Sequence, residues 1–235
     1  MKKAKIWIIP ALIIILLGVG FLVYAEIYYH ADATALEALK SDDTVSVEST
    51  SYGWFFDGPS EENALVFYPG AKVEETAYAP LLHELARQGM DVCLVKMPFH
   101  FAFFGANKAD AVIKLYEYEH WYIGGHSLGG AMAADYAAKH SDQLKGLILL
   151  AAYPTMELDD ALLEISVYGS EDQVLNMEKV RSGKAFAPVN FFEYEIAGGN
   201  HAQFGNYGIQ RGDGTAGITG TEQQQTTVDF IIQHF

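Results

Sequence analysis

The chain has 235 residues, half of them hydrophobic, which is enough for one folded domain and little more. Its 15 basic and 30 acidic residues give a net charge of -15, which argues against a nucleic-acid partner because the chain would repel a phosphate backbone. The single cysteine, Cys93, excludes an internal disulfide, and no Cys/His cluster has the spacing of zinc ligands. We therefore expect one domain stabilised by packing, without a metal or a cofactor.

The N-terminal segment is apolar enough to predict a membrane anchor. Residues 6–25 carry no charge, and they follow Lys2, Lys3 and Lys5. A stretch of this length spans a bilayer, and lysines before it predict a single-pass topology in a cell membrane, with the domain outside the cytoplasm. Cleavage after Val23-Tyr24-Ala25, as in a secretory signal peptide, is the main alternative. A buried helix of a soluble domain is a weaker one, because the segment has no polar face.

The rest of the chain predicts an α/β domain. We assign residues 1–26 to the anchor, 27–43 to a stalk and 44–235 to the domain. Short apolar runs predict strands at 45–49, 52–56, 64–68, 91–95, 121–123, 147–150 and 165–168, and helical patterns occupy 74–88, 108–118 and 131–140. Strands that alternate with helices predict a mostly parallel sheet with helices on both faces.

A Gly-x-Ser-x-Gly motif follows the strand predicted at 121–123. In Gly124-Gly125-His126-Ser127-Leu128-Gly129-Gly130, the glycines leave room for a sharp turn that exposes Ser127 between a strand and a helix. The start of that helix would present the backbone N–H of Leu128 to a developing oxyanion. A glycine-rich turn without chemistry is the alternative interpretation.

A serine nucleophile needs a base and a carboxylate, and in this kind of site they follow in the order Ser, Asp, His. Asp172 follows the strand predicted at 165–168, and His201 follows the apolar run 191–196, so both lie where a parallel sheet builds its sites. Rival acids are Glu171, Asp159 and Asp160. We expect His126 to be a packed neighbour of the elbow, and the remaining histidines to be surface or core residues.

A second oxyanion donor is expected in the turn after the first buried parallel strand. The candidate is the backbone N–H of Ala71, with Lys72 as the alternative, in Tyr68-Pro69-Gly70-Ala71-Lys72. A plain Pro-Gly turn is the competing interpretation, since only a backbone amide would matter here.

These three turns, in this order, resemble the α/β-hydrolase superfamily over residues 64–235. Within it the chain is similar to the small lidless branch of dienelactone hydrolases and compact carboxylesterases. The resemblance implies the α/β-hydrolase fold, a triad of Ser127, His201 and Asp172, and ester hydrolysis through an acyl-enzyme. Two departures are Ser127 where dienelactone hydrolases carry cysteine, and Pro69-Gly70 where His-Gly is usual. Residues 151–164 leave no room for a cap domain.

We expect a serine esterase that acts on small or medium acyl esters. Acyl transfer, amide or thioester cleavage, and a non-catalytic binding protein on the same fold remain alternatives. Four phenylalanines at residues 99–104 could line an acyl pocket, touch the bilayer or belong to the core. Arg211-Gly212-Asp213 matches a cell-adhesion tripeptide, which is weak evidence in the glycine-rich loop 205–220. The oligomeric state stays open.

Overall fold

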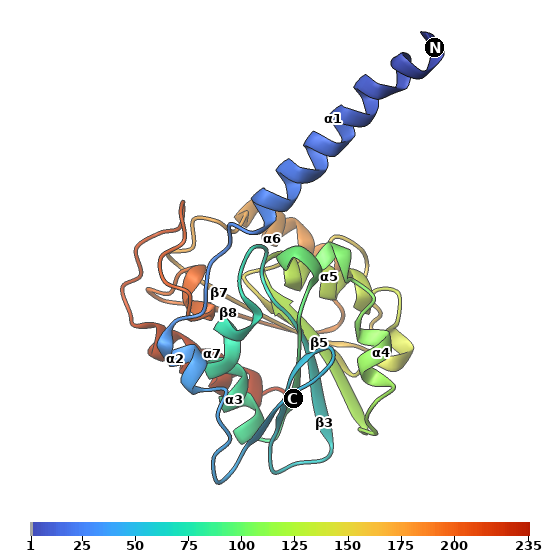
Figure 1. Ribbon diagram of the computed structural model, residues 1–235. Helices are drawn as coiled ribbons and strands as arrows, with labels where there is room; N and C mark the ends of the chain where they lie inside the picture. Colours follow the sequence, from blue (N-terminus) through green and yellow to red (C-terminus); the bar gives the residue numbers. More distant parts are fainter. Residues whose placement is uncertain (1) are drawn as a thin grey trace.

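The computed structural model describes the backbone of residues 2–235 and the side chains of residues 9–235. An eight-stranded sheet has the order β1-β2-β4-β3-β5-β6-β7-β8 (Figure 1). β1 and β2 are antiparallel to their neighbours and the other strands are parallel, which confirms the predicted mostly parallel sheet. The strands are β1 (Ser46–Ser49), β2 (Gly53–Asp57), β3 (Asn63–Tyr68), β4 (Asp91–Val95), β5 (His120–His126), β6 (Gly146–Leu150), β7 (Leu163–Gly169) and β8 (Asn190–Ile196).

Alternate residues of each central strand point to opposite faces of the sheet, and each face has its own core. Leu65 and Phe67 pack on the side covered by α3 (Ala79–Arg87) and α7 (Gly220–Ile232). Val66 and Cys93 pack on the side covered by α4 (Ala109–Ile113) and α5 (Leu128–Ala137) (Figure 1). Helices therefore cover both faces, as the sequence predicts.

The helix boundaries differ from the predictions in three places. The pattern at 74–88 forms a 3₁₀ turn, Glu75–Tyr78, followed by α3, and the pattern at 108–118 yields only the five residues of α4. The helix predicted at 131–140 begins earlier, at Leu128. Two helices were not predicted, α6 (Met177–Gly183) and α7. Between β6 and β7 the described residues form no helix.

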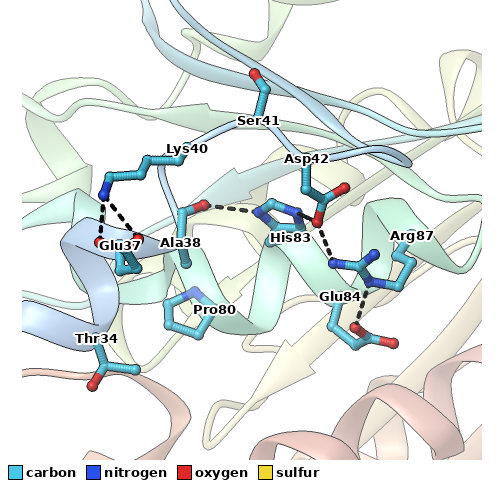
Figure 2. A pocket seen from close by; sticks show the side chains of 10 residues that line it. All are labelled: Thr34, Glu37, Ala38, Lys40, Ser41, Asp42, Pro80, His83, Glu84 and Arg87. Atoms are coloured by element: carbon cyan, nitrogen blue, oxygen red, sulfur yellow. Dashed lines mark hydrogen bonds and ion pairs between the residues drawn. The ribbon is translucent and has the colours of Figure 1, made fainter.

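The segment between α1 and β1, which the sequence suggested as a stalk, lies against the domain. It includes α2 (Ala33–Glu37), and Tyr29 pairs with Val73 in a short parallel bridge. Figure 2 shows its attachment to α3: His83 Nδ1 lies 2.8 Å from the Ala38 carbonyl, and His83 Nε2 lies 3.1 Å from Asp42 Oδ2. Arg87 donates to the same carboxylate oxygen over 2.6 Å.

Helix α1 (Lys2–Ala25) extends away from the domain at the edge where α6 lies (Figure 1). Most of its large apolar side chains from Ile9 to Tyr24 are exposed, and its last turns pack on the loop after β4, where Phe21 meets Phe99 and Phe104. The sequence predicts that residues 6–25 span a membrane. Among the residues that the structure describes, no helix has both the length and the apolar character that a membrane crossing needs, so the predicted span is not supported.

Candidate active site

Ser127 occupies the turn between β5 and α5. Its backbone has φ 53° and ψ -121°, a conformation that residues other than glycine adopt rarely and that is retained at functional sites. The neighbouring glycines permit this turn: a Cβ on Gly125 would lie 2.5 Å from the Tyr68 carbonyl oxygen, and one on Gly129 would lie 2.2 Å from it. No side chain fits at either position, so the spacing in the motif follows from close backbone packing against β3.

Asp172 and His201 form a buried pair. His201 Nδ1 lies 2.7 Å from Asp172 Oδ2, and the two side chains are 2% and 0% exposed. The other carboxylate oxygen, Oδ1, accepts the backbone N–H groups of Val174 at 2.9 Å and Leu175 at 2.8 Å. Both oxygens of the carboxylate are thus engaged, and the imidazole is held with Nδ1 toward the acid.

The second ring nitrogen of His201 is left free for chemistry. His201 Nε2 is buried and has no hydrogen-bond partner among the described residues. Ser127, Leu128 and His201 line one hollow of about 260 Å³, together with apolar side chains that include Val174 and Leu175. The three turns predicted from the sequence therefore meet at one hollow. The rival acids lie elsewhere: Glu171 is exposed, and Asp159 accepts the N–H of Ala161.

Two backbone N–H groups near Ser127 are available to a ligand. Leu128 is the first residue of α5, so its N–H has no acceptor within the helix. In the turn after β3, the Lys72 N–H donates to the His100 carbonyl over 2.8 Å, whereas the Ala71 N–H donates to no acceptor within the described chain. Of the two donors considered for this turn, the Ala71 amide is the one without a partner.

Residues 64–225 match the model of the Alpha/beta hydrolase family, which covers most of the chain. The chain belongs to the alpha/beta hydrolase family. Membership supports hydrolase activity and confirms the resemblance to the α/β-hydrolase superfamily, and no curated protein matches the sequence.

Solved structures resemble this hydrolase in fold. A monoacylglycerol lipase from Paleococcus ferrophilus is 14% identical with a TM-score of 0.61, and the alignment covers 81% of this chain and 99% of the lipase. A predicted CIB-like hydrolase from Thermoplasma acidophilum is 14% identical with a TM-score of 0.60, over 80% and 99% of the two chains. Est1E from Butyrivibrio proteoclasticus is 14% identical with a TM-score of 0.56, over 82% and 99%. At these identities the likeness establishes the shared fold alone.

His126 and Tyr78 are hydrogen-bonded neighbours of the candidate site. The Tyr78 hydroxyl accepts the Gly70 N–H at 3.0 Å and shares a hydrogen bond with His126 Nδ1 at 2.8 Å. Burial, and then the nearby charge of His201, hold the pKa of His126 well below its usual value, which keeps this imidazole neutral. The ring lies 4.5 Å from that of His201. His126 is thus a packed neighbour of the elbow.

Asp213 joins the loops that carry the acid and the base. Its Oδ2 accepts the N–H of Ala202, next to His201, at 2.8 Å, and its Oδ1 accepts the N–H of Gln173, next to Asp172, at 3.4 Å. Sequence reasoning noticed Asp213 only as part of a tripeptide. Its position in a glycine-rich loop after the base was the one available signal. Within the described chain, no group of three or more His, Cys, Asp or Glu residues is arranged to hold a metal ion.

Proposed function

We propose that the chain is a serine hydrolase that cleaves carboxylic esters of small or medium acyl chains. The observation that carries the proposal is the buried Asp172–His201 pair: His201 Nε2 has no hydrogen-bond partner among the described residues, and His201 and Ser127 line the same hollow. A serine hydroxyl is a weak nucleophile until a base of this kind takes its proton.

The reaction would proceed through two acyl transfers. Ser127 Oγ attacks the ester carbonyl carbon while His201 Nε2 takes the hydroxyl proton, and the backbone N–H groups of Leu128 and Ala71 stabilise the resulting oxyanion. Collapse breaks the bond to the alcohol oxygen, which leaves with the proton from His201. Water then attacks the acyl-enzyme, with His201 again as base, and releases the acid and free Ser127.

Asp172 would orient the base and stabilise its charged form. With Nδ1 donating to the carboxylate, Nε2 would be the nitrogen that accepts the serine proton. The protein groups in this scheme complete the cycle without a metal or a cofactor. The same steps would serve acyl transfer or the cleavage of amides and thioesters, and product analysis separates these outcomes.

The experiment that tests the proposal is covalent labelling by a fluorophosphonate probe, which reacts with activated serines. The wild-type chain should be labelled, and Ser127→Ala and His201→Ala should abolish labelling. Asp172→Asn should slow it by about 10³- to 10⁴-fold, because the amide favours the wrong tautomer of the base. His140→Ala is the matched control, since this histidine stacks on Tyr136 away from the hollow. A folded wild type that takes up no label would favour a non-catalytic binding protein.

We further propose, from the sequence of residues 6–25, that this segment attaches the domain to a cell membrane as a single-pass anchor, with the domain outside the cytoplasm. Residues 6–25 carry no charge, lysines precede them, and the large side chains of the helix from Ile9 to Tyr24 are apolar and mostly exposed. The full-length chain should stay with membranes after a high-salt wash, and a variant that lacks residues 1–25 should not. Mature protein that begins after Ala25 would instead indicate a cleaved signal peptide.

A further inference from the structure

The loop after β4 exposes three neighbouring phenylalanines. Phe99, Phe103 and Phe104 are 45%, 49% and 48% exposed. Their rings contact one another, with centroids 5.4 Å apart for Phe99 and Phe104 and 4.4 Å apart for Phe103 and Phe104. A contiguous exposed aromatic cluster is unfavourable in water and marks a surface that something else covers. We call these three residues the aromatic loop.

The conformation of the aromatic loop is itself costly. Phe99 and His100 are consecutive residues with positive φ, 55° and 57°, and neither is glycine. Such residues persist only where the surrounding structure holds them, which favours a functional reason for the exposure. His100 is held at two points: Tyr28 stacks on its ring at 3.8 Å, and its carbonyl accepts the Lys72 N–H at 2.8 Å.

Apolar surface continues from the aromatic loop onto α1. Phe21 of α1 contacts Phe99 and Phe104 at 5.5 and 5.7 Å between ring centroids. The helix beyond Phe21 carries exposed leucines and isoleucines back to Ile9. The loop therefore lies at the base of the helix, and aromatic side chains are enriched where a protein meets the interface between a bilayer and water.

Three lysines lie around this apolar surface, together with the acidic residues Glu26 and Glu75. Lys72 Nζ lies 3.7 Å from the centre of the Tyr24 ring, and Lys96 is 66% exposed beside Glu75. Lys108 donates to the Lys96 carbonyl, so it lies at the same place. Long basic side chains around an aromatic cluster are typical of proteins that contact lipid phosphates while their apolar side chains enter the acyl region.

The same loop adjoins the candidate active site on two sides. The bond from Lys72 to His100 joins it to the turn that holds the Ala71 amide. The 3₁₀ turn Ala102–Phe104 packs on α5, the helix that begins directly after Ser127. β3, β4 and β5 are parallel, so their carboxyl ends place all three turns at one edge of the sheet, the edge from which α1 leaves (Figure 1).

We propose that the aromatic loop rests in the surface of a lipid bilayer and that the enzyme takes its substrate, a membrane-borne acyl ester, from that surface. This inference rests on the proposed serine hydrolase function and specifies its substrate class. A site at the base of α1 meets acyl esters that are dissolved in the lipid, and the phenylalanines provide an apolar path from the lipid to the edge that holds Ser127. The Val174 and Leu175 side chains make part of the lining of the hollow apolar.

The test compares two esters on the full-length chain in phosphatidylcholine vesicles. One is a short-chain ester dissolved in the water, and the other is a long-chain acyl ester embedded in the vesicles. Phe103→Ser combined with Phe104→Ser should lower the rate on the embedded ester by at least about tenfold and change the rate on the soluble ester by less than about twofold. The matched control is Leu115→Ser with Val189→Ser, which removes two exposed apolar side chains near the opposite edge of the sheet, where β5 and β8 begin, and should change neither rate.

Equal rates for the wild type and the phenylalanine variant on the embedded ester would overturn the inference and leave the proposed function intact. A wild type that cleaves neither ester and takes up no fluorophosphonate would overturn the function itself. If the double variant does not fold, Phe103→Trp replaces it, in a chain that also carries Trp7→Phe: the tryptophan added at residue 103 should be quenched by brominated lipid in the vesicles, and one added by Val189→Trp on the same background should not. Absence of quenching at residue 103 would also overturn the inference.

Discussion

At the scale of single residues, Asp213 connects the turn that carries Asp172 with the turn that carries His201. It does so through backbone N–H groups only, so the side chains of the acid and the base keep their own bonds. A carboxylate that accepts several N–H groups in a partly buried position is worth more than an exposed one, because removing it leaves those donors without partners. We therefore regard Asp213 as a positioning residue for the proposed triad.

Asp213→Ala should lower kcat by about tenfold or more and leave KM nearly unchanged, since the base loses its alignment with Ser127 while the hollow keeps its lining. Asp213→Asn retains one acceptor oxygen and should recover part of the loss. Arg211→Ala, in the same tripeptide, is the control and should behave as wild type. The measurement is steady-state ester hydrolysis, and identical losses in the Ala and Asn variants would contradict the positioning role.

Tyr78 is the second residue that we expect to affect catalysis without touching the substrate. Tyr78→Phe would leave the Gly70 N–H and His126 Nδ1 without partners directly beside the Ala71 turn. We expect kcat to fall by about tenfold through loss of oxyanion alignment. Tyr122→Phe is the matched control, because Tyr122 is buried and its hydroxyl makes no hydrogen bond within the described chain. Equal kcat in the two variants would argue against this role.

At the scale of elements, strands were easier to predict than helices. A run such as residues 91–95 forms a strand because it is buried on both faces, and that pattern is visible in the sequence. The helix predicted at 108–118 is shorter than its sequence pattern because Tyr116 stacks on Phe55 at 4.7 Å and hydrogen-bonds with the Tyr52 hydroxyl at 2.9 Å. A local sequence pattern does not encode such contacts. Helix α7 did have a local signal, the capping box of Thr219 and Glu222, which the glycine-rich tract before it obscured.

The sequence predicted more of the proposed site than of the helices, because the three turns of the site carry short motifs in a fixed order. Ser127, Asp172 and His201 each follow a strand, and a parallel sheet brings such turns to one edge. The contributions of Asp213 and Tyr78 depend on side chains that reach across loops, so spacing along the chain gave no sign of them. The functional roles of all five residues remain predictions for the experiments above.

The β7 strand carries a buried carboxyl group that should make stability depend on pH. Glu164 is 1% exposed, and burial, followed by the charge of Glu193, raises its pKa from 4.5 to about 8. In the unfolded chain the group ionises near pH 4.5, whereas in the folded chain it holds its proton until about pH 8. The Glu164 carboxyl therefore favours folding most at low pH, and its contribution to the free energy of unfolding falls as the pH rises from 4.5 to about 8.

Glu164→Gln should flatten the dependence of the unfolding temperature on pH between about 5 and 8. The wild type should lose more stability than the variant as pH rises through this window, because only the wild type must bury a charge. Thermal unfolding at a series of pH values measures the difference, with the exposed Glu195→Gln as the control. Parallel curves for wild type and Glu164→Gln would show that the buried carboxyl is not responsible.

At the scale of the whole molecule, the chain before β1 belongs to the folded structure as far back as Tyr29. The carboxylate of Asp42 is central to this attachment, and Figure 2 shows its contact with Arg87. The backbone N–H groups of Thr44 and Val45, and then Arg87, hold the pKa of Asp42 below the usual value. A carboxyl with a depressed pKa contributes stability above its unfolded value of 3.8, and that contribution is lost as pH falls below it.

Asp42→Ala should release the segment and expose the bond after Lys40 to trypsin. We expect cleavage there to become several-fold faster at neutral pH, because local opening controls proteolysis of a folded chain. Asp43→Ala is the matched control, since the Asp43 carboxyl, next to Asp42 in the chain, makes no hydrogen bond within the described residues. Limited proteolysis followed by mass analysis of the fragments gives both rates, and equal rates would mean that the other contacts hold the segment.

The only thiol of the chain lies at the centre of this structure. Cys93 is fully buried in β4, where it pairs with Phe55 of β2 on one side and Val66 of β3 on the other. Burial raises its pKa to about 12, so the reactive thiolate is almost absent in the folded state. A thiol reagent can modify it only after the side chains packed over this face of the sheet move away. The rate of modification under native conditions therefore reports how often this core opens, from a single site that needs no engineered label.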